Sequence, residues 1–150
     1  MFGFLRKRKA PTKKTRRKRP VRRRLGPEIR KHYLEHKEAA REMILGRLLY
    51  WNQFYSFSIG DVRIKVTTSR WGSCSSNGNL NFHYQLLFLP PEITDYIIVH
   101  ELCHLGELNH SPAFWSLIEK TIPDYKTHMQ ALRKYHPLQA HLIKQTQEKT

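Results

Sequence analysis

The sequence of 150 residues has few cysteines and no long apolar segment. Two cysteines, Cys74 and Cys103, are too few for the disulfide framework of a small secreted protein. No run approaches the roughly 18 apolar residues of a membrane-spanning helix. The apolar residues that open the chain are too few for the core of a signal peptide. We therefore expect a cytoplasmic protein with reduced cysteines, of a length that suits one domain.

Acidic residues are absent from the first part of the chain. Residues 1–27 contain 13 lysines and arginines, whereas residues 28–150 contain 14 basic and 12 acidic side chains. The formal charge of +15 therefore belongs mainly to residues 1–27, which are expected to form a disordered tail because like charges repel one another. Residues 6–24 are a candidate contact for nucleic acid or anionic lipid. The alternative is a solvated arm with no dedicated partner.

Helical patterns dominate the rest of the sequence. Residues 28 to about 55 are rich in Glu, Lys, Arg, Ala and Leu, which favours an amphipathic packing helix after Pro27. Further helices are expected over residues 91–108, from Ser111-Pro112 onward, and over residues 124–135. The apolar stripe expected on the first helix consists of Leu34, Ala39, Ile44, Leu45, Leu48 and Leu49.

Two short segments alternate apolar and polar residues, which is the pattern of a half-buried strand. The first runs from Val62 to Val66 and the second from Leu80 to Tyr84. Between them, Asn77-Gly78 is typical of a tight turn. We therefore expect a hairpin or a small antiparallel sheet, and with the helices an α+β fold.

The segment His100-Glu101-Leu102-Cys103-His104 carries the chemistry of the chain. Residues four apart lie on one face of a helix, so His100 and His104 can offer imidazole nitrogens to one ion. Glu101 lies beside them and can reach a water on the metal without binding the metal, as the general base of a zincin does. His110 follows Gly106 and can return as a third ligand, which leaves a fourth position for water.

Other interpretations of these histidines remain open. They can hold a purely structural metal, in which case a fourth ligand such as Cys74 is needed, or they can have no metal and lie on the surface. Imidazole also binds nickel, copper and iron, so spacing does not identify the ion. The remaining unpaired histidines are expected to be ordinary, namely His83, His128, His136 and His141.

Several motifs occur in order along the chain. They are Arg70-Trp71-Gly72-Ser73-Cys74, Asn79-Leu80-Asn81-Phe82, Leu89-Pro90-Pro91-Glu92, the run from Tyr96 to His104, and Asn109-His110-Ser111-Pro112-Ala113-Phe114-Trp115. Together they resemble the YgjP-like metallopeptidase family, which is related to the SprT and WLM zinc metalloproteases.

The resemblance covers residues 28–136 and implies a small zincin-like, minigluzincin-like domain. Such a domain has an N-terminal helix, a short antiparallel sheet, an active-site helix and following helices. The resemblance implies that Zn²⁺ is held by His100, His104 and His110, with Glu101 as catalytic acid/base. Residues 137–150 are expected to be a C-terminal tail or a short helix.

Three functions follow as hypotheses. The first is a zinc metallopeptidase that hydrolyses peptides or proteins, with Arg70, Trp71 and Tyr96 as candidate cleft residues. For Trp71, packing in the core is the favoured alternative. The second is an SprT-like protease tethered to nucleic acid by its basic residues. The third is a non-enzymatic nucleic-acid-binding module with a structural metal, which the presence of Glu101 disfavours. The substrate and the oligomeric state stay open.

Overall fold

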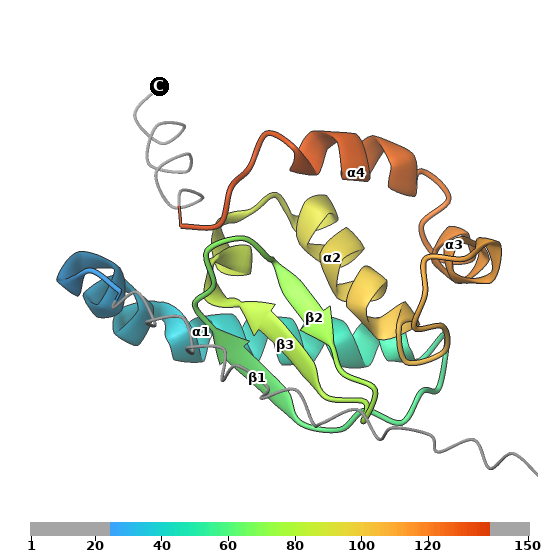
Figure 1. Ribbon diagram of the computed structural model, residues 1–150, viewed down its shortest axis with the longest axis horizontal. Coiled ribbons are helices and arrows are strands. Elements are labelled where there is room, and N and C mark those ends of the chain that lie inside the picture. Colours follow the sequence, from blue (N-terminus) through green and yellow to red (C-terminus); the bar gives the residue numbers. More distant parts are fainter. Residues whose placement is uncertain (1–24, 139–150) are drawn as a thin grey trace, which may run out of the picture.

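The computed structural model describes residues 25–138, which form four α-helices, a 3-10 helix and three strands (Figure 1). This arrangement confirms the expected α+β class. No helix in that range is long and apolar enough to cross a membrane. Most of the expected basic tail, residues 1–24, and residues 139–150 lie outside the described residues. The elements in chain order are α1 (Pro27–Asn52), β1 (Val62–Lys65), β2 (Gly72–Cys74), β3 (Leu80–His83), η1 (Tyr84–Phe88), α2 (Pro91–Cys103), α3 (Pro112–Glu119) and α4 (Tyr125–Leu132).

Helix α1 contacts the core through a narrower stripe than its sequence suggests. Its fully buried residues are Ala40, Ile44 and Leu48, which recur every four positions and so lie on one face. Three residues of the expected stripe were placed wrongly, because Leu34, Ala39 and Leu49 are exposed. The helix ends at Asn52, whose side chain bonds both the amide and the carbonyl of Phe57 at 2.9 Å and turns the chain back.

The strand pairing differs from the expected hairpin. Strands β1 and β3 are parallel, with Val62 opposite Leu80, and β3 lies in the centre of the sheet. The antiparallel partner of β3 is β2, which the alternation of apolar residues did not reveal because it spans only Gly72–Cys74. The turn at Asn77-Gly78 joins β2 to β3, and Gly78 has a φ of +79° that glycine adopts without strain.

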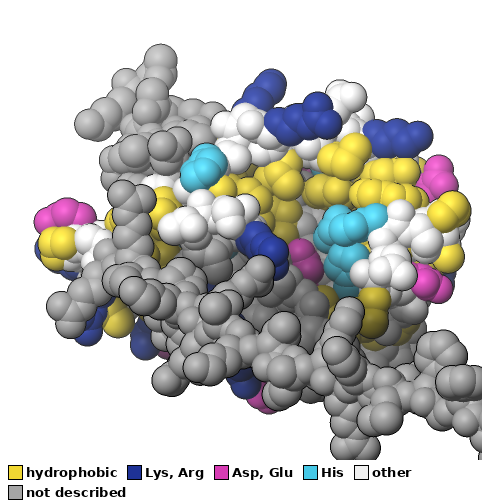
Figure 2. Space-filling view, in the orientation of Figure 1, with side chains coloured by type: hydrophobic (Ala, Val, Ile, Leu, Met, Phe, Trp, Pro, Cys, Tyr) yellow, Lys and Arg dark blue, Asp and Glu magenta, His cyan; other side chains and the backbone are white. Residues whose placement is uncertain are grey.

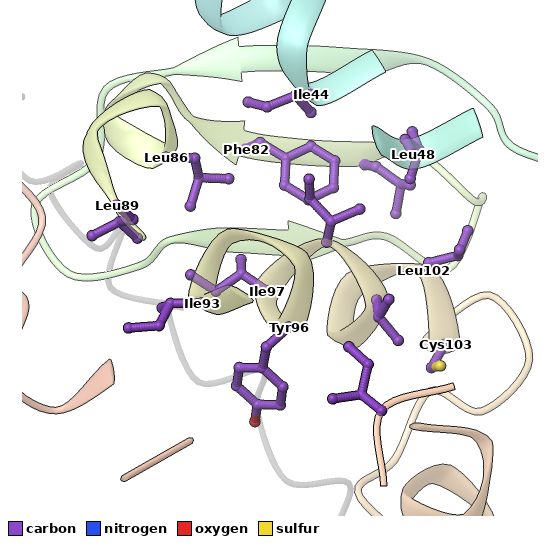
Figure 3. Packing of buried hydrophobic residues seen from close by; sticks show 14 of the residues in the cluster. Ile44, Leu48, Phe82, Leu86, Leu89, Ile93, Tyr96, Ile97, Leu102 and Cys103 are labelled. Carbon is purple, nitrogen blue, oxygen red and sulfur yellow. The ribbon is translucent and has the colours of Figure 1, made fainter. Parts of the chain in front are cut away.

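The core lies between α1, the sheet and α2 (Figure 3). Ile44 and Leu48 from α1 and Phe82 from β3 point toward apolar residues of α2 such as Ile97 and Leu102. On its other side α2 packs against α3 and α4, so it is buried nearly all round. This burial explains why the residues before His100 are apolar on every face.

Two further contacts position the ends of α2. Arg47 of α1 forms an ion pair with Asp95 at 2.6 Å, which joins the first turns of α2 to α1. The helix ends at Cys103, five residues before the expected end at residue 108. Gly106 lies in the turn that follows, where an added Cβ would lie 2.8 Å from the ring of Phe57. Helix α4 is likewise shorter than expected, and Tyr84 starts η1 instead of ending β3.

Candidate metal centre

The structure brings His100, His104 and His110 together at the C-terminal end of α2. One nitrogen from each imidazole lies within 4.8 Å of the others. The Nε2 atoms of His100 and His110 are 3.1 Å apart, although ten residues separate them in the chain. The segment after Gly106 therefore returns His110 to the helix face that carries the other two histidines.

His104 is oriented by a carbonyl group of the loop after α2. Its Nδ1–H donates to the backbone carbonyl of Glu107 at 2.9 Å. Because a carbonyl oxygen can only accept, this bond places the proton on Nδ1 and leaves the lone pair of Nε2 for a metal. Metal-binding histidines commonly have such an outer partner.

His110 is positioned by the start of α3. Ser111 is the N-cap of that helix, where its Oγ accepts from the amide of Phe114 at 3.4 Å, and Pro112 occupies the first turn. The ring of Trp115 stacks on His110 with centroids 5.8 Å apart and an angle of 26°. The side-chain cap of the adjacent Ser111 and the ring contact with Trp115 therefore orient this exposed histidine.

Phe114 forms an apolar floor beneath all three imidazoles. Its ring is fully buried and stacks on His104 at 4.4 Å, with His110 at 4.9 Å and His100 at 5.0 Å. Burial, together with the neighbouring His104 and His110, lowers the pKa of His100 to about 3. Burial also lowers the pKa of His104. Neutral imidazoles have the free lone pair that a metal requires.

Glu101 lies beside the histidines and against strand β2. Its side chain is only 8% exposed. Burial raises its pKa to about 7, and the nearby positive charge of Arg70 acts in the opposite direction. A Cβ on Gly72 would lie 2.6 Å from Cγ of Glu101 and 2.9 Å from its Oε1. Only glycine at this position lets the carboxyl group lie so close to the strand.

Two adjoining pockets open beside the histidines. Both are lined by Arg70, Gly72, His100 and Glu101. The first, of about 220 Å³, continues between Trp71, Tyr96, Ile97 and Leu132, and the second, of about 300 Å³, between Ser73, Cys74, His104, Leu108 and His110. The three expected cleft residues, Arg70, Trp71 and Tyr96, thus all line the first pocket.

The side chains of Trp71 and Tyr96 also pack inside the domain. Trp71 is half-buried and meets the ring of His83 edge-on at 5.5 Å. Tyr96 is almost fully buried, and its ring lies 5.9 Å from that of His100. Burial raises the pKa of Tyr96 to about 12, so its hydroxyl stays protonated at neutral pH. Both aromatic residues therefore combine packing with a place on the pocket wall.

The remaining histidines and cysteines lie away from the cluster. His83 is buried between its own partners, and His128 lies 3.2 Å from Asp124. His136 bonds the carbonyl of Pro137, while His141 lies outside the described residues. Cys103 is buried in the core, and burial raises its pKa to about 11. Cys74 lines the second pocket without joining the histidine cluster.

Four features of the site were not found from the sequence. They are the close approach of Gly72, the aromatic floor of Phe114, the Glu107 carbonyl and the exposed apolar side chain of Leu108. In the sequence Gly72 appeared only as part of the motif Arg70-Trp71-Gly72-Ser73-Cys74, because nothing in a linear pattern shows which strand will pack against Glu101. The Glu107 carbonyl has no sequence signal, since every residue has one.

The fold is that of a small metallopeptidase domain. The sequence matches the YgjP-like metallopeptidase domain over residues 5–135, and the chain belongs to that family. The match includes residues 5–27, which the resemblance in the sequence motifs did not cover. Membership of this family implies a catalytic metal and peptide or protein substrates.

Solved structures of two other proteins have a similar fold. The zymogen of abylysin from Pyrococcus abyssi is 26% identical, with a TM-score of 0.55 over 61% of this chain and 93% of abylysin. The zymogen of jannalysin from Methanocaldococcus jannaschii is 20% identical, with a TM-score of 0.51 over 63% and 94%. Both are metallopeptidases. Comparison with curated proteins gave no match.

Proposed function

We propose that this chain is a zinc-dependent peptidase in which His100, His104 and His110 hold the ion and Glu101 is the general base. The observation that carries the proposal is the convergence of three imidazoles beside a buried carboxyl group that is not part of their cluster. Catalytic zinc sites have three protein ligands and an open position, whereas structural sites have four.

The donor set fits zinc. Two nitrogens that each lie about 2.0–2.1 Å from one tetrahedral ion are about 3.4 Å apart. The Nε2 atoms of His100 and His110 are 3.1 Å apart, which is close to that spacing. Within residues 25–138 no fourth His, Cys, Asp or Glu joins the cluster, so a structural site is disfavoured. When bound, zinc supplies a Lewis acid for the substrate carbonyl and the attacking water.

Glu101 is suited to move the proton of the attacking water. A pKa of about 7 lets the carboxylate accept a proton and then give it to the leaving amine at neutral pH. Gly72 lets this carboxyl group lie against β2. The two pockets lined by Glu101 offer room for the residues that flank the scissile bond. Phe114 excludes water from beneath the histidines and strengthens electrostatic interactions there.

The proposal is tested by metal analysis beside a peptide-cleavage assay. Glu101→Gln is expected to keep one zinc per chain and to lower turnover by about 10²- to 10⁴-fold, the usual contribution of a general base. Glu119→Gln, an exposed acid of α3, is the matched control and is expected to cleave like the parent. Equal cleavage by Glu101→Gln and the parent would contradict the assigned role. A zinc-loaded parent that cleaves no peptide in a diverse mixture would contradict the peptidase function.

A further inference from the structure

An arginine whose guanidinium pairs with none of the described residues lies at the entrance of the proposed active site. Arg70 is exposed and lines both pockets beside His100 and Glu101. It also lines a third pocket of about 160 Å³, which lies along β2 and β3. Within residues 25–138 its guanidinium forms no hydrogen bond and no ion pair, whereas Arg41, Arg47 and Arg63 each pair with an acid. The five donors of Arg70 are therefore available to a ligand.

Hydrogen bonds hold the backbone of Arg70 and of the following Trp71 in place. The hydroxyl of Thr67 donates to the Arg70 carbonyl at 2.5 Å, and the amide of His83 donates to the Trp71 carbonyl at 2.8 Å. The ring of Trp71 is in turn fixed against His83. A constrained loop thus presents the guanidinium, and only its long side chain has freedom to adapt to a ligand.

Few charged side chains surround this guanidinium at the entrance. Among the described residues that line the two pockets, Arg70 is the only lysine or arginine and Glu101 the only acid. Glu101 lies against Gly72 and is affected by the positive charge of Arg70, but among the described residues the two side chains form no ion pair. Figure 2 shows basic, acidic and histidine side chains gathered in this hollow.

We propose that Arg70 binds a carboxylate of the substrate next to the scissile bond, so that the preferred substrates carry a negative charge beside the cleavage site. This inference rests on the proposed peptidase function and adds the substrate class. The planar guanidinium matches a carboxylate with two parallel hydrogen bonds. The adjoining apolar pocket of Trp71, Tyr96, Ile97 and Leu132 takes the neighbouring large apolar side chain. An acidic side chain and a C-terminal carboxylate both supply the required group.

The experiment uses the full zinc-loaded chain and a matched peptide set. One apolar peptide sequence carries Glu, Gln or Lys at each position in turn, and every peptide is made with a free and with an amidated C-terminus. Cleavage is measured for the parent, for Arg70→Gln, for Arg70→Glu and for Arg30→Gln, which removes the same charge from the exposed first turn of α1. Binding of the same labelled peptides to zinc-loaded Glu101→Gln, with and without Arg70→Gln, is measured by fluorescence anisotropy.

We expect the parent to favour one Glu position, or the free C-terminus, by about tenfold or more in kcat/KM, mainly through KM. Arg70→Gln is expected to remove this preference, Arg70→Glu to transfer it to a Lys-containing peptide, and Arg30→Gln to change nothing. A preference confined to free C-termini identifies the α-carboxylate as the ligand. A preference for an internal Glu that survives amidation identifies the side chain.

Two results would overturn the inference without touching the peptidase proposal. One is equal cleavage of all peptides by the parent. The other is a loss of kcat in Arg70→Gln that is the same for charged and neutral peptides, which would assign Arg70 to the reacting carbonyl. Conversely, Arg70-dependent binding of charged peptides with no cleavage would support the inference while the peptidase function fails.

Discussion

His83 and the histidine cluster at the end of α2 differ in how their ring nitrogens are used. His83 has both nitrogens satisfied by the chain itself: Nε2–H donates to the Thr67 carbonyl at 3.0 Å, and Nδ1 accepts from the Gln85 amide at 3.1 Å. At the end of α2, His104 has one nitrogen bound to the Glu107 carbonyl, and His100 and His110 turn their Nε2 atoms toward each other.

Burial lowers the histidine pKa at both places, and the difference lies in where the ring nitrogens point. Burial lowers the pKa of His83 to about 4 and that of His100, with help from its two neighbours, to about 3. A depressed histidine pKa therefore does not mark a functional site by itself. The convergence of three imidazole nitrogens distinguishes the proposed metal site, whereas His83, with two partners inside the chain, is a structural element.

The largest effect is expected from His104→Ala. Removing one of three ligands should abolish stoichiometric zinc binding and all turnover that depends on zinc. Zinc content after dialysis, measured by elemental analysis, checks the result. Retention of one zinc per chain would remove His104 from the ligand set and break the comparison with His83.

His83→Ala is expected to lower the stability of the fold and to leave zinc binding unchanged. It leaves a cavity and two unpaired backbone groups in the interior, which should lower the free energy of unfolding by roughly 2–5 kcal/mol. Zinc stoichiometry at low temperature should remain that of the parent. Denaturant unfolding gives the stability. A loss of zinc from the folded variant would show that His83 and the histidine cluster at the end of α2 are not independent.

Gly72→Ala tests the position of Glu101 separately from that of the three histidines. The new methyl group would lie 2.6 Å from Cγ of Glu101, so the carboxyl group must shift, while the histidines are untouched. A displacement of this size costs about 10²-fold in turnover. Kinetics together with zinc analysis check the prediction, and Gly46→Ala, where an added Cβ meets nothing, is the control. Normal turnover in Gly72→Ala would mean that the position of Glu101 is not critical.

The pH dependence of stability sharpens the comparison further. The pKa of His83 is about 4 in the folded chain and 6.5 as an ordinary value, so the unfolded chain binds more protons between these pH values. The stability from neutral His83 is therefore complete above about pH 6.5 and is lost as the pH falls toward 4. Unfolding of the metal-free protein should become easier by about 1.5 kcal/mol between pH 6.5 and about pH 5 through this group. His83→Gln should flatten the profile by that amount, and an unchanged profile would contradict it.

The smallest effect on the site is expected from substitutions in the basic segment, residues 6–24. Replacing Arg16, Arg17, Lys18 and Arg19 by Gln in the full chain should leave zinc content and peptide cleavage unchanged. If this segment contacts nucleic acid, the slope of log affinity against log salt should fall by about 1 for each phosphate contact that is lost. Binding to duplex DNA at several salt concentrations measures the slope. An unchanged slope would leave residues 6–24 as a solvated arm.

Local patterns were enough to predict the elements that carry the chemistry. Two histidines four apart in an apolar segment predicted a buried helix that presents both rings on one side, and α2 has this form. Ser111-Pro112 predicted the start of α3, because a hydroxyl cap and a proline at the first position act within three residues. Asn77-Gly78 likewise marked the turn that now joins β2 to β3.

Long-range features were beyond such patterns. The parallel pairing of β1 with β3 depends on β2 being placed at the far edge, which no alternation in a three-residue strand reveals. The exposure of Leu34 and Leu49 depends on how far the small core extends along α1. That the guanidinium of Arg70 forms no ion pair within residues 25–138 is visible only when the neighbouring acids of that range have been located.

By itself, the sequence determined the spacing of His100 and His104 at the end of α2 and the carboxyl group of Glu101 between them, because helical geometry converts spacing into direction. Only the tertiary structure decided that His110 returns to within reach of His100, that Glu101 lies against a glycine of β2, and that Phe114 closes the site from below. These contacts join segments that are distant in the chain, and their distances follow from the packing of the whole domain.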